Sequence, residues 1–216
     1  MRKLRWEFVM AIIGFWFVLF MTWNEYSKVL TFSVVLTGIF IAFIRIHWYP
    51  LAFDKNIERV ESYLRNQKNT PGMYINYVMA NKLDDEAEVV MEQVRLKYKR
   101  EVAQAPFKAA YGFYNQDMNA IREAIPHIRW SDYRTYYETY LLLEEGNSEQ
   151  ARERLKSIKK HWMRSALLGA IELKAGRRDL AIQLAKEALD VSKGVHHYVL
   201  YKEYERLYPE VVKTVS

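Results

Sequence analysis

Two long apolar runs near the N-terminus constrain the fold of this chain more than any other feature. Residues 8–23 and 29–44 each contain sixteen consecutive residues without a charged side chain. A membrane-spanning helix needs roughly 20 apolar residues, and Trp and Tyr gather where such helices meet lipid headgroups. Aromatic residues such as Trp48 flank both runs. The pattern therefore predicts two membrane spans, at about 6–23 and 29–48, joined by a short loop.

We interpret residues 1–50 as a transmembrane helical hairpin that contacts the lipid bilayer through residues 6–48. A cleaved signal peptide is one alternative, but the first run ends in Met21, Thr22 and Trp23 and not in the small residues of a cleavage site. A buried hairpin in a soluble protein is another alternative. Two uncharged, aromatic-rich helices fit a soluble core poorly, because helices that are apolar all round are typical of membrane spans.

Basic residues around the two runs predict their orientation. Three precede the first apolar run and four follow the second: Arg2, Lys3 and Arg5, then Arg45, Lys55, Arg59 and Arg65. The loop between the runs has one Lys and one Glu. Since cytoplasmic flanks carry the excess of Lys and Arg, both termini are expected in the cytoplasm. The predicted location is the cell membrane, with a multi-pass topology.

A different pattern dominates residues 162–193. Leu and Ala recur there at helical spacing on both sides of Gly176, which stands where a helix C-cap requires positive φ. The segment resembles a tetratricopeptide repeat (TPR), whose main signature positions are matched by Leu168-Gly169, Gly176, Ala181 and Ala188-Leu189. Two signature residues are missing, because Glu172 replaces an aromatic residue and no Pro follows the second helix.

The same frame recurs three times upstream. G-N-S-E-Q-A, beginning at Gly146, has the form of G-R-R-D-L-A, beginning at Gly176, and weaker copies begin at Asn115 and Lys82. The alanine five residues after each of these positions recurs at intervals of 33, 31 and 30: Ala87, Ala120, Ala151 and Ala181. The TPR period is about 34. The resemblance implies a TPR-like α-solenoid of about four degenerate helix pairs.

No run in residues 51–216 alternates convincingly enough to be a strand, so we expect this cytoplasmic TPR-like helical-repeat domain to be all-α. A helix capped by Asp54 should continue to about Gln67. Pro126 is expected to shorten the helix that precedes it. Further helices are expected at about 73–82, 84–103, 107–115, 117–125, 132–145, 148–160, 163–175, 178–192 and 196–207.

The composition argues against several kinds of chemistry. There is no Cys, so neither a disulfide framework nor a Cys-bound metal is expected. None of the five His residues belongs to a metal-binding motif, and no phosphate-binding Gly loop or G-x-S-x-G motif is present. We therefore predict no enzyme, no cofactor and no metal. Residues 51–216 hold 27 basic and 24 acidic residues, a mixed surface that does not indicate nucleic-acid binding.

A stripe of tyrosines in residues 131–140 suggests where a partner binds. In the repeat frame, Tyr133, Tyr136 and Tyr140 match positions that line the concave face of TPR proteins, whereas Tyr137 points between the paired helices. The equivalent positions elsewhere are Asn76 and Met79, Ala105 and Ala109, and Met163, Ala166 and Ala170. The candidate partner-binding groove consists of Asn76, Met79, Tyr133, Tyr136, Tyr140 and Met163. The alternative is that this stripe packs only within the protein.

These patterns predict a membrane-anchored protein-interaction module. It would act as an adaptor, assembly factor or regulator of a membrane complex, and its TPR-like surface would bind a membrane-associated protein partner. In the alternative hypothesis, the chain is an accessory subunit of a transporter or secretion complex, and the transmembrane hairpin is the functional part.

Overall fold

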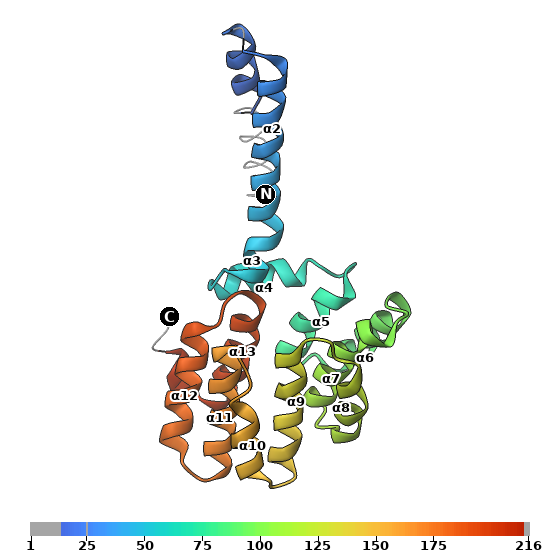
Figure 1. Ribbon diagram of the computed structural model, residues 1–216, viewed down its shortest axis with the longest axis vertical. Coiled ribbons are helices and arrows are strands. Elements are labelled where there is room, and N and C mark those ends of the chain that lie inside the picture. The colour runs from blue at the N-terminus through green and yellow to red at the C-terminus, as the bar shows by residue number, and fades with distance from the viewer. Residues whose placement is uncertain (1–13, 25, 214–216) are drawn as a thin grey trace. The chain divides into compact units, whose positions relative to one another are not determined.

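The computed structural model describes residues 14–24 and 26–213, and it divides into two compact units, Met1–Pro50 and Leu51–Ser216. Within the described residues, every regular element is helical (Figure 1). This confirms the all-α prediction. The part of the first predicted span at residues 6–13 lies outside the described residues.

The N-terminal unit contains one helix that is long and apolar enough to cross a membrane. Helix α2 (Lys28–Phe43) begins after Ser27, whose side chain accepts a hydrogen bond from the backbone N–H of Leu30, and it continues as a π-helical stretch, η1 (Ile44–Trp48). Residues Lys28–Ile46 have a mean hydropathy of 2.3, and none of them is buried. At 1.5 Å per residue these 19 residues extend about 28 Å, close to the thickness of a bilayer core. A shorter apolar helix covers Gly14–Trp23.

In its described residues, the second unit contains four pairs of helices, one helix before them and two helices after them. These elements are α3 (Tyr49–Ala52), which leads into the unit, then α4 (Ile57–Arg65), α5 (Pro71–Ala80), α6 (Asp84–Lys97), α7 (Glu101–Tyr114), α8 (Met118–Ala124), η2 (Ile125–His127), α9 (Ser131–Glu144), α10 (Ser148–Leu155), α11 (His161–Lys174), α12 (Arg178–Val191), α13 (Gly194–Leu207) and α14 (Pro209–Val212). The pairs α5–α6, α7–α8, α9–α10 and α11–α12 each pack together.

Each pair is joined by the same three-residue turn. Its middle residue has positive φ: Lys82 at 54°, Gln116 at 59°, Gly146 at 83° and Gly176 at 77°. The next residue in each turn donates its N–H to the carbonyl five residues earlier, as Arg177 does to Glu172 at 2.9 Å. This is the Schellman arrangement that satisfies the last carbonyls of a helix. Four short turns of one geometry make each pair an antiparallel helix hairpin.

One pair departs from the expected frame by a single residue. The sequence pattern places the turn at Asn115 and the buried alanine at Ala120, but Gln116 takes the positive φ and Ile121 is fully buried. The cause is Asp117, whose side chain accepts hydrogen bonds from two backbone N–H groups and caps α8. The turn residues are therefore spaced by 34, 30 and 30. Ala120 is only partly buried.

Several helix boundaries also differ from those predicted, and α10 ends at Leu155 and not at about residue 160. Helix α6 ends at Lys97 and does not continue to residue 103, because Tyr98 is extended and Gln104 of α7 donates a side-chain hydrogen bond to its carbonyl. Helix α7 then includes Pro106 in its second turn, where a missing N–H costs one hydrogen bond. The predicted short helix before Pro126 is confirmed as α8 followed by η2.

The start of α4 differs as well. Asn56, and not Asp54, caps this helix by accepting a hydrogen bond from the N–H of Arg59. Asp54 is instead buried, and its carboxylate accepts hydrogen bonds from the backbone of Asn56 and from the Arg59 guanidinium. The buried carboxylate thereby fixes the segment that leads into α4.

Helix α13 closes the second unit on itself. It packs against α4 and α5, which are far away in the sequence, as well as against α12. Tyr198 is fully buried with Val60, Leu64 and Ala80, and its hydroxyl accepts a hydrogen bond from the Asn81 side chain at 2.6 Å. Helix α13 therefore completes the core around α4.

Candidate functional site

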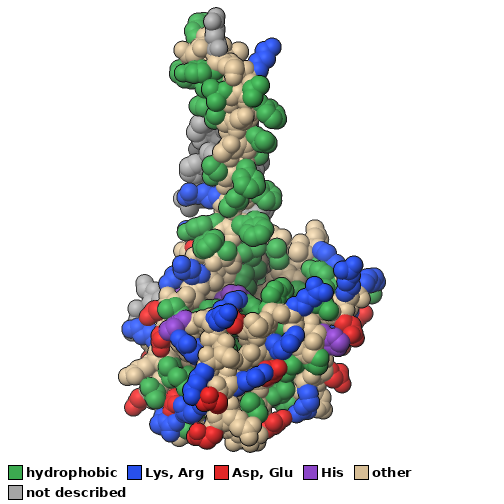
Figure 2. Space-filling view, in the orientation of Figure 1, with side chains coloured by type: hydrophobic (Ala, Val, Ile, Leu, Met, Phe, Trp, Pro, Cys, Tyr) green, Lys and Arg blue, Asp and Glu red, His purple; other side chains and the backbone are tan. Residues whose placement is uncertain are grey.

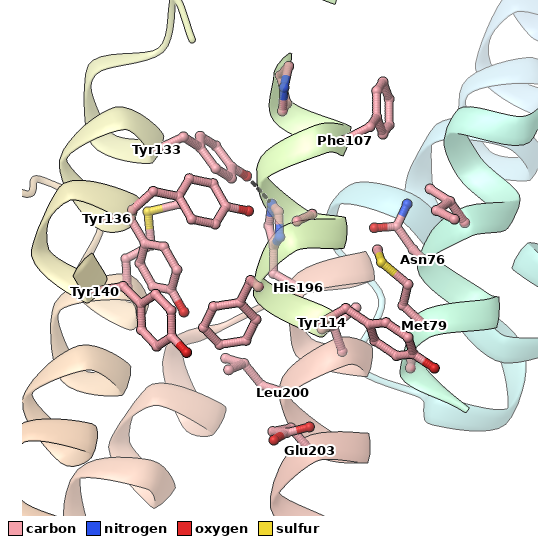
Figure 3. Close-up of a pocket in the computed structure, with 18 of the residues that line it drawn as sticks. Asn76, Met79, Phe107, Tyr114, Tyr133, Tyr136, Tyr140, His196, Leu200 and Glu203 are labelled. Carbon is pink, nitrogen blue, oxygen red and sulfur yellow. Dashed lines mark hydrogen bonds between the residues drawn. The ribbon is translucent and has the colours of Figure 1, made fainter. Parts of the chain in front are cut away.

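The first helix of each pair, together with α13, surrounds a cavity of about 510 Å³ (Figure 3). Tyrosines project into it from α9, while Asn76 and Met79 of α5 lie opposite, with His196, Leu200 and Glu203 between them in this view. The cavity opens to solvent, because Trp130, Phe113 and Val199 line it and are 61%, 37% and 37% exposed. The first helices of neighbouring pairs line the cavity together, because every pair has the same turn geometry and the pairs stack side by side.

Most of the surface near the tyrosines is aromatic. The Phe113 ring lies 4.5 Å from the Tyr140 ring between centroids, and the Trp162 ring stacks on His196 at 4.7 Å. The Tyr133 hydroxyl is hydrogen-bonded to Nε2 of His196 at 2.9 Å. This bond ties α9 to α13 and fixes one end of the cavity.

Titratable groups in this part of the cavity are uncharged at neutral pH. Burial raises the pKa of Tyr133 to about 12, with the Asp132 charge as a second cause. Burial also raises the pKa of Tyr140 to about 12 and raises that of Tyr136. The pKa of His196 is lowered to about 4 by burial and by the nearby Lys160 charge. The site therefore offers neutral hydroxyl groups on an aromatic surface.

The opposite end of the cavity is polar. Glu203 lies there in Figure 3, away from Tyr133, and it forms an ion pair with Arg206 at 2.7 Å. The same guanidinium donates a hydrogen bond to the backbone carbonyl of Ala80 at 2.8 Å. The Lys82 ammonium lies 4.2 Å from the centroid of the Tyr114 ring, an arrangement that favours a cation–π interaction. A ligand in the cavity would thus contact an apolar end and a charged end.

The structure brings all six predicted groove residues to this one cavity. Asn76, Met79, Tyr133, Tyr136 and Tyr140 are half-buried there. Met163 also lines the cavity, but it is 1% exposed and belongs to the core between α9 and α11.

The prediction that two alanines of α7 occupy groove positions is wrong. Ala105 and Ala109 are buried in the core, and their neighbours Pro106 and Ala110 line the cavity. This follows from the one-residue shift of the turn at Gln116. Ala166 and Ala170 pack into core clusters as well.

Sequence reasoning missed the residues that α13 and the ends of the first helices contribute. Phe113 lies three residues before the turn residue Gln116, as Met79 does before Lys82. The corrected frame would therefore have identified Phe113. His196 and Glu203 had no such signal, because their place depends on the long-range packing of α13.

In the part of the chain that the structure describes, no three His, Asp or Glu side chains lie close enough together to hold a metal ion. Comparison with known proteins finds no matching family model, no matching curated protein and no matching solved structure.

Proposed function

We propose that this chain is a membrane-anchored protein-interaction module, whose TPR-like helical unit binds a segment of a membrane-associated partner in the aromatic cavity. The observation that carries the proposal is the cavity itself, which three tyrosines and the first helices of successive pairs surround. Tyr and Trp dominate binding energies at protein interfaces, because they supply a large contact area at low cost in entropy. By binding such a partner, the chain would act as an adaptor, assembly factor or regulator of a membrane complex.

The size of the cavity determines how a partner would bind. A volume of about 510 Å³ is within the range of roughly 300–1,000 Å³ for sites that enclose compact ligands. Helix α13 lines this volume together with the first helices, and a cavity of that size accepts a few side chains and not a whole helix. The aromatic end suits an apolar anchor, and Lys82 and Arg206 suit an acidic or carbonyl group beside it.

The TPR-like part of the proposal is supported by the turns. Turns of one geometry recur at spacings of 34, 30 and 30, and Ala87, Ile121, Ala151 and Ala181 follow them at equivalent buried positions. Such regular stacking of helix pairs is how α-solenoids build a binding surface.

The membrane part of the proposal is a hairpin with spans at about 6–23 and 29–48 and both termini in the cytoplasm. Helix α2 supports it, because polar side chains on this apolar helix satisfy themselves internally: Thr31 and Thr37 donate to the carbonyls of Ser27 and Ser33. A reporter that works only in the cytoplasm should be active when fused at residue 216. Activity of an export-dependent reporter at that position would exclude the two-span topology.

Replacing Tyr136 and Tyr140 together by Ala tests the cavity. Loss of an aromatic anchor costs about 2 kcal/mol or more of binding free energy if it is a hot spot. The variant should lose partners that co-purify with the full chain in mild detergent, while its unfolding midpoint falls less than that of Tyr137→Ala. Tyr137 is the control, because it is 7% exposed and its loss should cost about 3–5 kcal/mol of stability.

A crosslinking experiment locates the contact directly. A photo-crosslinking amino acid at Val199, on the cavity rim, should capture the partner, whereas the same group at Val191, equally exposed on α12, should not. If the Tyr136/Tyr140 variant keeps every partner, the cavity is not the binding site. The hairpin would then be the part of the chain that binds.

A further inference from the structure

The connections between helix pairs are uniformly basic. They comprise residues 66–70, 98–100, 128–130, 156–160 and 192–193, and together they contain eight Lys or Arg residues and no Asp or Glu. All eight are exposed. Among the described residues, only Lys156 of these eight lies within ion-pair distance of a carboxylate. Two of the others, Lys160 and Lys68, lie over the rings of Tyr133 and Tyr74 at 4.5 and 5.8 Å from the centroids. Since no carboxylate neutralises these seven charges within the described residues, they can attract an anionic partner.

These connections lie at one end of the helical unit. Each pair is an antiparallel hairpin, so the four turns lie at the other end, as the lower turns after α9 and α11 illustrate (Figure 1). Figure 2 shows Lys and Arg side chains along the upper edge of the unit, and others on its sides and lower edge beside Asp and Glu. The turn end is different, because it carries acidic residues as well: Asp84, Asp85, Asp117, Glu144 and Glu145.

The chain enters the helical unit at the same basic end. Gly194, which follows the last connection, donates its N–H to the carbonyl of Asp54 at 2.9 Å, and the Lys55 ammonium donates to the carbonyl of Asp190. The candidate span ends at Ile46, only five residues before the unit begins at Leu51. Only a short stretch of chain therefore joins the candidate span to the basic end of the unit.

Exposed aromatic residues accompany the positive charges. Trp130 is 61% exposed within the 128–130 connection, and Phe53 is 58% exposed in the segment that enters the unit. Aromatic rings beside basic side chains are typical of surfaces that rest on lipid headgroups.

Two carboxylates at this end are engaged within the protein, whereas those of Glu58 and Asp190 are exposed. Glu101 lies 3.5 Å from Nε2 of His127, and Asp132 accepts a hydrogen bond from the backbone N–H of Lys159. Both are in the first turn of a helix, where the macrodipole stabilises negative charge. They reduce the net positive charge of this end without reversing it.

We infer that this basic end is a docking surface for anionic lipid headgroups, which holds the helical unit against the membrane that anchors it. Each Lys or Arg near an anionic membrane contributes roughly a fivefold increase in the docking equilibrium. The inference rests on the membrane anchoring proposed above but not on partner binding in the cavity. Docking would leave the turn end directed away from the lipid.

The absence of Cys allows a position-specific test on the full chain. A fluorophore is attached to Ser157→Cys at the basic end, or to Asn147→Cys in the turn at the other end of α10, and both positions are exposed. The chain is placed in nanodiscs of phosphatidylcholine, with or without phosphatidylglycerol, that carry a contact quencher on the lipid headgroup. Co-elution of the chain with the nanodiscs confirms insertion separately.

Quenching at residue 157 should rise when phosphatidylglycerol is present and fall again in about 0.5 M salt, which screens charges beyond a few ångströms. The label at residue 147 should show neither change. Replacing Lys99 and Lys159 by Glu should weaken docking by about 30-fold from the lost lysines alone. A matched pair at the turn end, Lys174→Glu with Arg178→Glu, makes the same change in net charge at exposed positions beside the Gly176 turn and should leave quenching unaltered.

Two results would overturn the inference. One is quenching at residue 157 that does not depend on lipid charge in nanodiscs that contain the chain. The other is an equal effect of the two charge-reversed pairs, which would show a response to net charge and not to this surface. In either case the proposed binding cavity would remain to be tested by its own variants.

Discussion

Replacing Gly194 by Ala should strongly destabilise the helical unit, because at this residue the start of α13 meets the segment that enters the unit. Gly194 has φ of +58°, and an added Cβ would lie 1.9 Å from the carbonyl oxygen of Leu51 and 2.8 Å from the backbone N of Ala52. Neither neighbour is a flexible side-chain tip, so the backbone itself must move. The hydrogen bond from Gly194 to Asp54 would be lost with that movement.

The magnitude follows from separate contributions. Positive φ at a residue with a Cβ costs about 1–2 kcal/mol, overpacking costs about 1–3 kcal/mol, and the lost hydrogen bond costs about 1 kcal/mol. Their sum, about 3–6 kcal/mol, should lower the melting temperature of a unit of this size by about 6–24 °C. Thermal unfolding of the full chain in mild detergent, followed by far-UV circular dichroism, measures the change.

Gly176→Ala is the matched control. Gly176 also has positive φ, at +77°, but nothing lies within 4 Å of an added Cβ. This variant should show the conformational strain alone, about 1–2 kcal/mol. If the two variants lower the melting temperature equally, residues 51 and 52 do not approach Gly194 closely. The closure of the unit by α13 would then be wrong.

Two further predictions concern the α11–α12 pair. Ala181 is fully buried, and its carbonyl oxygen would lie 3.4 Å from a Cβ on Gly169. Ala181→Leu should therefore lower the free energy of unfolding in denaturant by about 1–3 kcal/mol. A change at the exposed Leu180 should cost little, and equal costs would contradict the repeat frame. Hydrogen bonds from Arg177 and Arg152 hold the pKa of buried Glu172 below its usual range. Its stabilisation should therefore be complete above the unfolded carboxyl pKa of about 4.3 and lost as pH falls through the lower folded value. Glu172→Gln should be less stable than wild type by about 1–3 kcal/mol at neutral pH, and denaturant titrations near pH 3 should show that difference shrinking; a difference that is constant with pH would contradict it.

Local chemistry in the sequence predicted the helix pairs well. Gly146 and Gly176 mark turns that need positive φ, and the buried alanines five residues later confirm the frame in those two pairs. The turn was wrongly predicted at Asn115 because only the preference of a residue for positive φ was considered. Asn tolerates positive φ better than Gln, but the side-chain cap of Asp117 and the burial of Ile121 together outweigh that preference.

Long-range packing explains what the sequence could not show. The pattern of α13 indicates a helix at about 196–207, but no local signal indicates that it returns to α4 and α5. Its cavity residues, such as His196 and Glu203, were therefore missed. The tyrosine stripe was found because Tyr133, Tyr136 and Tyr140 lie on one helix, whose face is fixed by the turn that follows it.

Closure by α13 also has a consequence for how the protein is made. The bond between Asn81 and Tyr198 joins residues 117 positions apart, and that between Ala80 and Arg206 joins residues 126 apart. A ribosome adds about 5–20 residues per second, so roughly 6–25 s separate the synthesis of the two sides. During that interval Val60 and Leu64, which Tyr198 covers in the finished unit, remain uncovered. The nascent chain thus exposes an apolar surface until α13 has been synthesised and can pack against it.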